Sequence, residues 1–165
     1  MMTVVIHQHH AGQVHFRRNG RIGVLATPAT LASARYQALL RQHAEGICVF
    51  SQGCPGLADL IESGVLDSPA LRALVERCCA PLRAAGVDTV LMGCTHYPLM
   101  ERVFQEALGQ GVKVYSQANL VAESLADYLT RRPEFIGAGT VSKFLTTGDA
   151  RSVSDRATQF LRRRV

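Results

Sequence analysis

Short apolar runs alternate along this chain with longer stretches in which apolar residues recur every three or four positions. The short runs are typical of buried strands, and the periodic stretches are typical of amphipathic helices. Strands that alternate with helices predict a parallel sheet with helices on both faces. The predicted fold class is therefore α/β, a three-layer sandwich with a mostly parallel sheet. We expect strands at residues 21–26, 47–50, 87–92, 112–115 and 144–147, and helices at residues 27–42, 54–63, 67–85, 98–108, 119–130 and 149–164, with Leu120, Leu125 and Leu129 buried.

The stretch VDTVLMGCTHYPLM, residues 87–100, carries most of the candidate chemistry. Its strand is expected to end just before Cys94, Thr95 and His96, and Pro98 suits the first turn of the next helix. In open α/β sheets, ligands bind at the carboxyl ends of the strands. A thiol reacts as its thiolate, and a neighbouring imidazole can exchange its proton. Cys94 and His96 are therefore a candidate acid/base pair; the alternative is a small buried cysteine beside a capping histidine.

Three further polar residues follow expected strands or end an expected helix. Thr27 suits an N-cap, with Pro28 in the first turn and Thr30 three residues on. These threonines are either helix caps or ligand contacts at a strand end. Glu62 lies near the end of its helix, where a carboxylate is unfavourable for the helix dipole, so a second role is worth seeking. The alternative for Glu62 is a plain surface residue.

Length and composition exclude several classes of protein. The chain has 165 residues, of which 47% are hydrophobic, which is enough for one domain with its own core. No run approaches the roughly 18 apolar residues of a membrane span, and the first residues lack the pattern of a secretory signal peptide. We therefore expect a cytoplasmic protein with no membrane partner. Five cysteines without a C-x-x-C pair argue against a disulfide framework and a structural zinc site.

The net charge of +5 comes mainly from arginine, with clusters at residues 17–21 and 162–164. Phosphates attract such clusters, but no nucleic-acid-binding motif accompanies them. We interpret them as solvated charge near the termini and do not expect nucleic acid as a partner. Four histidines between residues 7 and 15 leave metal binding open, although we favour a flexible leader at residues 1–20.

Four segments add a family resemblance: RIGVLATPATLASARY at residues 21–36, CPGLADLIESG at 54–64, GCTHYP at 93–98 and FLTTG at 144–148. In this order they resemble glutamate racemase, in the cofactor-independent aspartate/glutamate racemase superfamily. The resemblance covers roughly residues 21–160. It implies racemisation of glutamate without pyridoxal phosphate, metal or nucleotide, and a supply of D-glutamate for peptidoglycan. A related aspartate or hydantoin racemase is the alternative.

The resemblance also implies roles for individual residues. Cys94 would act as the acid/base group and His96 as its proton partner. The substrate, glutamate, would be held by Thr95, Thr27, Thr30 and Glu62.

The family's first lobe carries D-S-G and C-N-T motifs, and this chain has neither. The resemblance therefore assigns residues 21–118 to the second lobe and residues 119–165 to a C-terminal segment that would complete the missing first lobe, with residues 1–20 as an unmatched leader. The family places one cysteine on each face of the substrate, and only Cys94 matches. We expect a truncated chain, impaired alone, whose partner is a second copy or the missing lobe. A non-catalytic remnant or binding module is the alternative.

Overall fold

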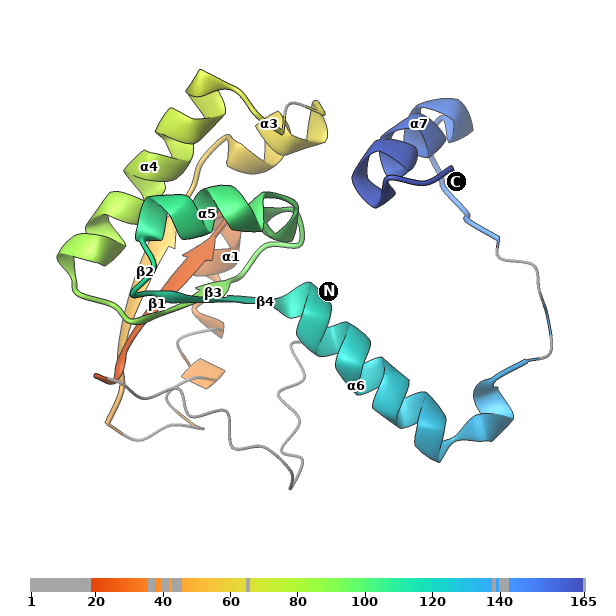
Figure 1. Ribbon diagram of the computed structural model, residues 1–165, viewed down its shortest axis with the longest axis horizontal. Coiled ribbons are helices and arrows are strands. Elements are labelled where there is room, and N and C mark those ends of the chain that lie inside the picture. Colours follow the sequence, from red (N-terminus) through yellow and green to blue (C-terminus); the bar gives the residue numbers. More distant parts are fainter. Residues whose placement is uncertain are drawn as a thin grey trace.

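The computed structural model describes residues 19–35, 38–39, 42, 46–64, 66–137, 139 and 143–164. Within them, four parallel strands form one sheet in the order β2-β1-β3-β4 (Figure 1). The predicted α/β class with a mostly parallel sheet is confirmed. The strands are β1 (Arg21–Ala26), β2 (Cys48–Gly53), β3 (Thr89–Met92) and β4 (Lys113–Ser116).

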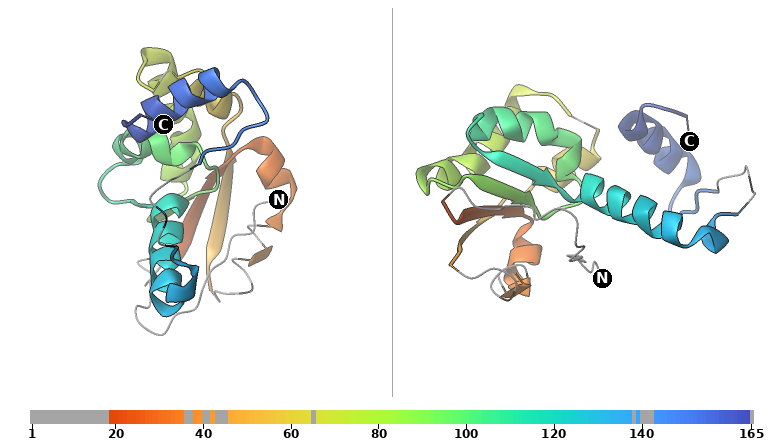
Figure 2. Two further views of the ribbon diagram at one scale, coloured as in Figure 1. Left: turned by 90° about the vertical axis from the view of Figure 1, so that its right-hand side faces the viewer. Right: turned by 60° about the horizontal axis from the view of Figure 1, so that its bottom comes forward.

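Helices cover both faces of this sheet. The helices are α1 (Pro28–Ala32), α3 (Leu57–Glu62), α4 (Pro69–Ala84), α5 (Glu101–Leu108), α6 (Gln117–Arg131) and α7 (Ala150–Leu161), with 3-10 turns at Tyr97–Met100 and Pro133–Phe135. On one face α4 and α5 pack against each other, and α1 lies on the other face (Figure 2). The molecule therefore has the three expected layers of helix, sheet and helix.

The central strand β1 shows why its apolar run is continuous. Leu25 belongs to the main core cluster beneath α4 and α5, whereas its neighbours Val24 and Ala26 pack with Leu31 of α1 on the opposite face. Successive strand residues point to opposite faces of a sheet. A strand that is covered on both faces is apolar throughout, as in other parallel sheets.

Two of the expected helices contain a break or a change of helix type that the prediction lacks. The helix expected over residues 27–42 is interrupted, because α1 ends at Ala32 and Ala34 has a left-handed backbone with φ of 51°. The helix expected from Pro98 begins as the 3-10 turn Tyr97–Met100 before α5 starts. In both places the apolar spacing continues through the break. Spacing alone therefore does not reveal these local changes in the backbone.

The segment after β4 departs most from expectation. α6 projects from the edge of the sheet (Figure 1), and its apolar face is exposed: Leu120 by 43% and Leu125 by 54%. Our expectation of buried leucines is wrong for these two, and Leu129 is only half-buried. An amphipathic pattern identifies a face that needs cover but does not say what covers it.

The last expected strand, residues 144–147, is also absent. These residues are irregular and exposed, and no strand in the described part of the chain pairs with them. After them, α7 returns toward α3 (Figure 1), where the Gln159 side-chain amide donates to the Gly64 carbonyl at 2.8 Å. Phe160 packs against the main core cluster, whereas Phe144 stays 63% exposed. Only the end of this segment is therefore anchored to the sheet domain.

Candidate active site

The candidate site lies at the carboxyl edge of the sheet. The register of β1 and β3 pairs Leu25 with Met92, so Thr27 and Cys94 both lie two residues beyond that pair. The Gly93 N–H donates to the Leu25 carbonyl at 2.7 Å, which continues the pairing past the end of β3. The fold therefore brings the two sequence segments with candidate residues to one edge, where open α/β sheets bind ligands.

A thiol, an imidazole and a carboxylate lie in line at this edge. The Cys94 Sγ is 3.7 Å from His96 Nδ1, and His96 Nε2 is 2.8 Å from Glu62 Oε1. Cys94 is 8% exposed, and the His96 and Glu62 side chains are 28% and 52% exposed. Glu62 comes from the last residue of α3, far from Cys94 in the sequence. A carboxylate is unfavourable at a helix end, and the contact with His96 offers a physical reason for Glu62 to be there.

The contact with Glu62 determines which nitrogen of His96 carries the proton in the neutral ring. A carboxylate only accepts hydrogen bonds, so Nε2 bears the proton and donates to Glu62. Nδ1 is then the acceptor, and it faces the Cys94 thiol. The arrangement can therefore take a proton from the sulfur and return it.

Thr27 and Thr30 lie where β1 turns into α1. The Thr27 hydroxyl accepts from the Thr30 backbone N–H at 3.3 Å, and the two hydroxyl oxygens are 2.9 Å apart. Thr27 is thus the N-cap of α1, as its sequence context predicted. Both side chains are half-buried, and Thr95 is exposed beside Cys94. The structure gathers these three hydroxyls at the same edge as the thiol.

Tyr97 supports this site and was missed by our sequence analysis. Its ring is fully buried, 5.4 Å from the ring of Phe104, and its hydroxyl donates to the Cys54 carbonyl at 3.5 Å. Burial raises the pKa of this phenol well above its usual value, so it stays neutral. Tyr97 therefore fixes the turn that follows Cys94 and His96 to the start of the α3 segment. The signal was its place inside the GCTHYP segment.

The other four cysteines are either buried in the core or placed at the amino edge of the sheet. Cys54, Cys78 and Cys79 are at most 2% exposed in the core. Contact with Cys78 and burial hold the pKa of Cys54 well above its usual value, and burial raises the pKa of Cys79 to about 12. Cys48 is exposed but begins β2 beside Arg21, at the opposite edge of the sheet. Cys54 directly follows β2 and so also lies at the carboxyl edge, but its thiol is buried in the core; Cys94 is the cysteine at that edge whose thiol contacts an imidazole.

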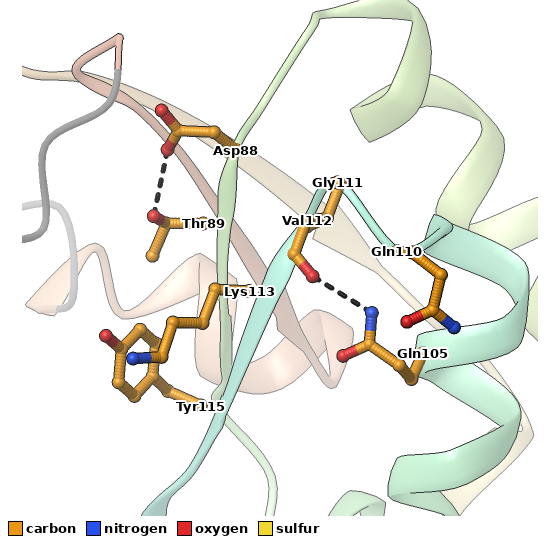
Figure 3. A pocket seen from close by; sticks show the side chains of 8 residues that line it. All are labelled: Asp88, Thr89, Gln105, Gln110, Gly111, Val112, Lys113 and Tyr115. Carbon is orange, nitrogen blue, oxygen red and sulfur yellow. Dashed lines mark hydrogen bonds between the residues drawn. The ribbon is translucent and has the colours of Figure 1, made fainter.

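A cavity of about 490 Å³ lies at the amino ends of β3 and β4 (Figure 3). Gln105 spans one side of it by donating to the Val112 carbonyl at 2.9 Å, and Asp88 accepts from the Thr89 hydroxyl at 2.9 Å on the other. None of the candidate site residues lines it. The lining residues are Asp88, Thr89, Gln105, Gln110, Gly111, Val112, Lys113 and Tyr115.

Among the residues that the structure describes, no cluster of three histidine, cysteine or acidic side chains could hold a metal ion. The histidines at 7–15 lie outside those residues. In the same part of the chain, no helix combines the length and the apolar character that crossing a membrane requires.

Comparison with known proteins agrees with the fold. The family model of the Asp/Glu/Hydantoin racemases matches residues 3–125, and the chain belongs to this family. The match begins before residue 21, so it includes most of the stretch that we expected to be an unmatched leader.

Curated relatives specify the family further. The chain is 58% identical to a glutamate racemase of Cereibacter sphaeroides (strain ATCC 17025 / ATH 2.4.3), over 87% of this chain and 53% of that protein. It is 51% identical to a glutamate racemase of Dinoroseobacter shibae, with the same coverage. The chain thus spans about half the length of the curated relatives it matches.

Solved structures show the same fold. A glutamate racemase isoform from Bacillus anthracis matches with a TM-score of 0.79 and 31% identity, over 90% of this chain and 56% of that one. A glutamate racemase from Francisella tularensis, solved in complex with D-glutamate, matches with a TM-score of 0.75 and 21% identity, over 88% of this chain and 55% of that one. The expected resemblance to glutamate racemases is confirmed.

Proposed function

We propose that this chain is the Cys94-bearing half of a glutamate racemase, which interconverts L- and D-glutamate by acid/base chemistry at a thiol. The alignment of Cys94, His96 and Glu62 at the carboxyl edge is the observation that carries the proposal. The names of the relatives favour glutamate over aspartate or hydantoin as the substrate. We expect the product to be D-glutamate for peptidoglycan, made in the cytoplasm.

Cys94 would exchange a proton with the substrate Cα on one of its two faces. When Cys94 acts as base, its thiolate takes the Cα proton, the C–H bond breaks, and its electron pair delocalises into the substrate carboxyl group. When Cys94 acts as acid, its S–H returns a proton to that carbon. His96 Nδ1, 3.7 Å from the sulfur, stores the thiol proton between these events, and Glu62 stabilises the imidazolium that results.

The remaining candidate residues would hold the substrate. Thr27, Thr30 and Thr95 present hydroxyls at the same edge, which suit a carboxylate. Glu62 carries a negative charge and, besides orienting His96, is close enough to the edge to attract the substrate ammonium group. The substrate would thus be fixed with its Cα against Cys94.

Inversion also requires a second acid/base group on the opposite face of Cα. Cys54, Cys78 and Cys79 are buried in the core, and Cys48 lies at the far edge, so none of them can take this role. We propose that a partner supplies the second group, either the complementary half present in the longer relatives or a second copy of this chain. The exposed apolar face of α6 offers a surface for either partner.

A chimera tests the proposal. In the Cereibacter sphaeroides enzyme, the matched 146-residue part is replaced by the corresponding part of this chain. The circular dichroism of D-glutamate should decay to zero with the chimera and stay constant with this chain at concentrations where it is a monomer. A cooperatively folded chimera that racemises neither enantiomer would overturn the proposal and favour a non-catalytic binding module. A monomeric chain that is as fast alone as the chimera would contradict the need for a second group.

A further inference from the structure

The peptide group between Met92 and Gly93, one residue before Cys94, is held by two hydrogen bonds. Its N–H, that of Gly93, donates to the Leu25 carbonyl of β1 at 2.7 Å. Its carbonyl, that of Met92, accepts from the side-chain amide of Gln117 at 3.0 Å. The orientation of this peptide sets the direction in which the chain leaves β3, and therefore the position of the Cys94 thiol.

The place of Gln117 follows from the ladder between β3 and β4. The Lys113 N–H donates to the Asp88 carbonyl at 2.8 Å, and donors on a parallel strand recur every two residues. Along this ladder, residue 117 is therefore the donor position opposite the Met92 carbonyl. At that residue, however, the chain turns from β4 into α6, with Ser116 as the N-cap. The Gln117 side-chain amide donates to the Met92 carbonyl, the last acceptor of the β3–β4 ladder.

We propose that Gln117 is a positioning residue for Cys94: by holding the Met92 carbonyl, it keeps the thiol in contact with His96. Gln117 is also the first residue of α6. It therefore connects the strand end that carries the thiol to the helix whose apolar face is exposed. The proposal rests on the proposed function only in taking Cys94 as the reactive group. Its test measures the thiol itself and uses no glutamate.

The chain contains a matched control. Gln105 likewise uses its side-chain amide to hold backbone carbonyls, those of Gly109 and Val112, each at 2.9 Å. It does so at the amino edge of the sheet, beside the cavity of Figure 3 and away from Cys94. Gln105→Met therefore removes the same kind of hydrogen bond without touching the candidate site.

The experiment measures the rate at which iodoacetamide alkylates Cys94, by peptide mapping, in the full chain. Gln117→Met should slow this rate about fivefold at pH 7, because the thiol is then displaced from His96 Nδ1, the group that accepts its proton. At pH 10, above the usual pKa of a thiol, the rate should stay within about twofold of wild type. Gln105→Met should match wild type at both pH values.

Two results would overturn the proposal. Wild-type reactivity of Gln117→Met at pH 7 would show that the bond does not position the thiol. Equal slowing at pH 7 and pH 10 would show a general change in access rather than a lost contact with His96. If Gln117→Met does not fold, Gln117→Asn, which keeps the amide but shortens its reach, is measured in its place and must meet the same criteria. Failure of the chimera as a racemase leaves these rates interpretable.

Discussion

At the scale of single residues, access and neighbours distinguish the five thiols. Three are buried in the core, where contact and burial keep the pKa of Cys54 and Cys79 high. Cys48 is exposed and lies on the edge strand β2, where it pairs with Arg21 of β1. Cys94 combines a position at the carboxyl edge with an imidazole 3.7 Å away. Contact with Cys54 lowers the pKa of Cys78, but that thiol is buried in the core, so we expect Cys94 to be the reactive thiol of the site.

We predict that Cys94 is alkylated fastest of the five cysteines at neutral pH. Cys79, whose pKa is about 12, should remain unreacted even at pH 9, because its thiol stays protonated and buried. Iodoacetamide labelling against pH, read by peptide mapping, gives the order. His96→Ala should bring the Cys94 rate at pH 7 down to that of Cys48. Faster labelling of Cys54 or Cys78 in the native protein would show that the site is misassigned.

At the scale of secondary-structure elements, sequence patterns were reliable where an element packs into the sheet domain. The four strands of the sheet and the long helix α4 lie close to their predicted places, because burial dictates their apolar spacing. The pattern failed after β4. The FLTTG segment has the composition of a strand, but a strand also needs a neighbour with which to pair, and a partner edge is not encoded in the segment itself.

The candidate site shows a similar limit. Cys94, Thr95 and His96 are adjacent in sequence and were found together, whereas the contact between His96 and Glu62 joins two segments 34 residues apart. Family resemblance, not spacing, brought Glu62 into the site. Tyr97 and Gln117 were not singled out, because their roles depend on the carbonyls that face them in the folded chain.

The anchoring of α7 gives a test at this scale. Phe160 packs on the core cluster and is half-buried, whereas Phe144 is 63% exposed. Phe160→Ala should lower the free energy of unfolding by about 1 to 2 kcal/mol, less than for a fully buried phenylalanine. The matched variant Phe144→Ala should change it by no more than about 0.5 kcal/mol. Urea unfolding measures both, and equal effects would contradict the packing of α7 described above.

At the scale of the whole molecule, the chain is a well-packed sheet domain with an extended C-terminal segment. α6 projects from the edge of the sheet with Leu120, Val121, Leu125 and Tyr128 between 42% and 64% exposed (Figure 1). We propose that this exposed apolar face is the surface through which a partner binds. The sheet domain supplies one thiol, and the proposed reaction needs a second group from a partner. The exposed face of α6 and the proposed need for a second acid/base group both suggest a partner.

The most direct measurement of the central claim compares two cysteine variants in the chimera with the Cereibacter sphaeroides enzyme. Cys94→Ser should lower the rate of glutamate racemisation by about 10² to 10⁴-fold, since it removes the acid/base group on one face of Cα. Cys48→Ser, an equally small change at the opposite edge of the sheet, should leave the rate within about twofold of the parent chimera. If Cys94→Ser keeps more than about a tenth of the activity, the thiol at the carboxyl edge is not the acid/base group.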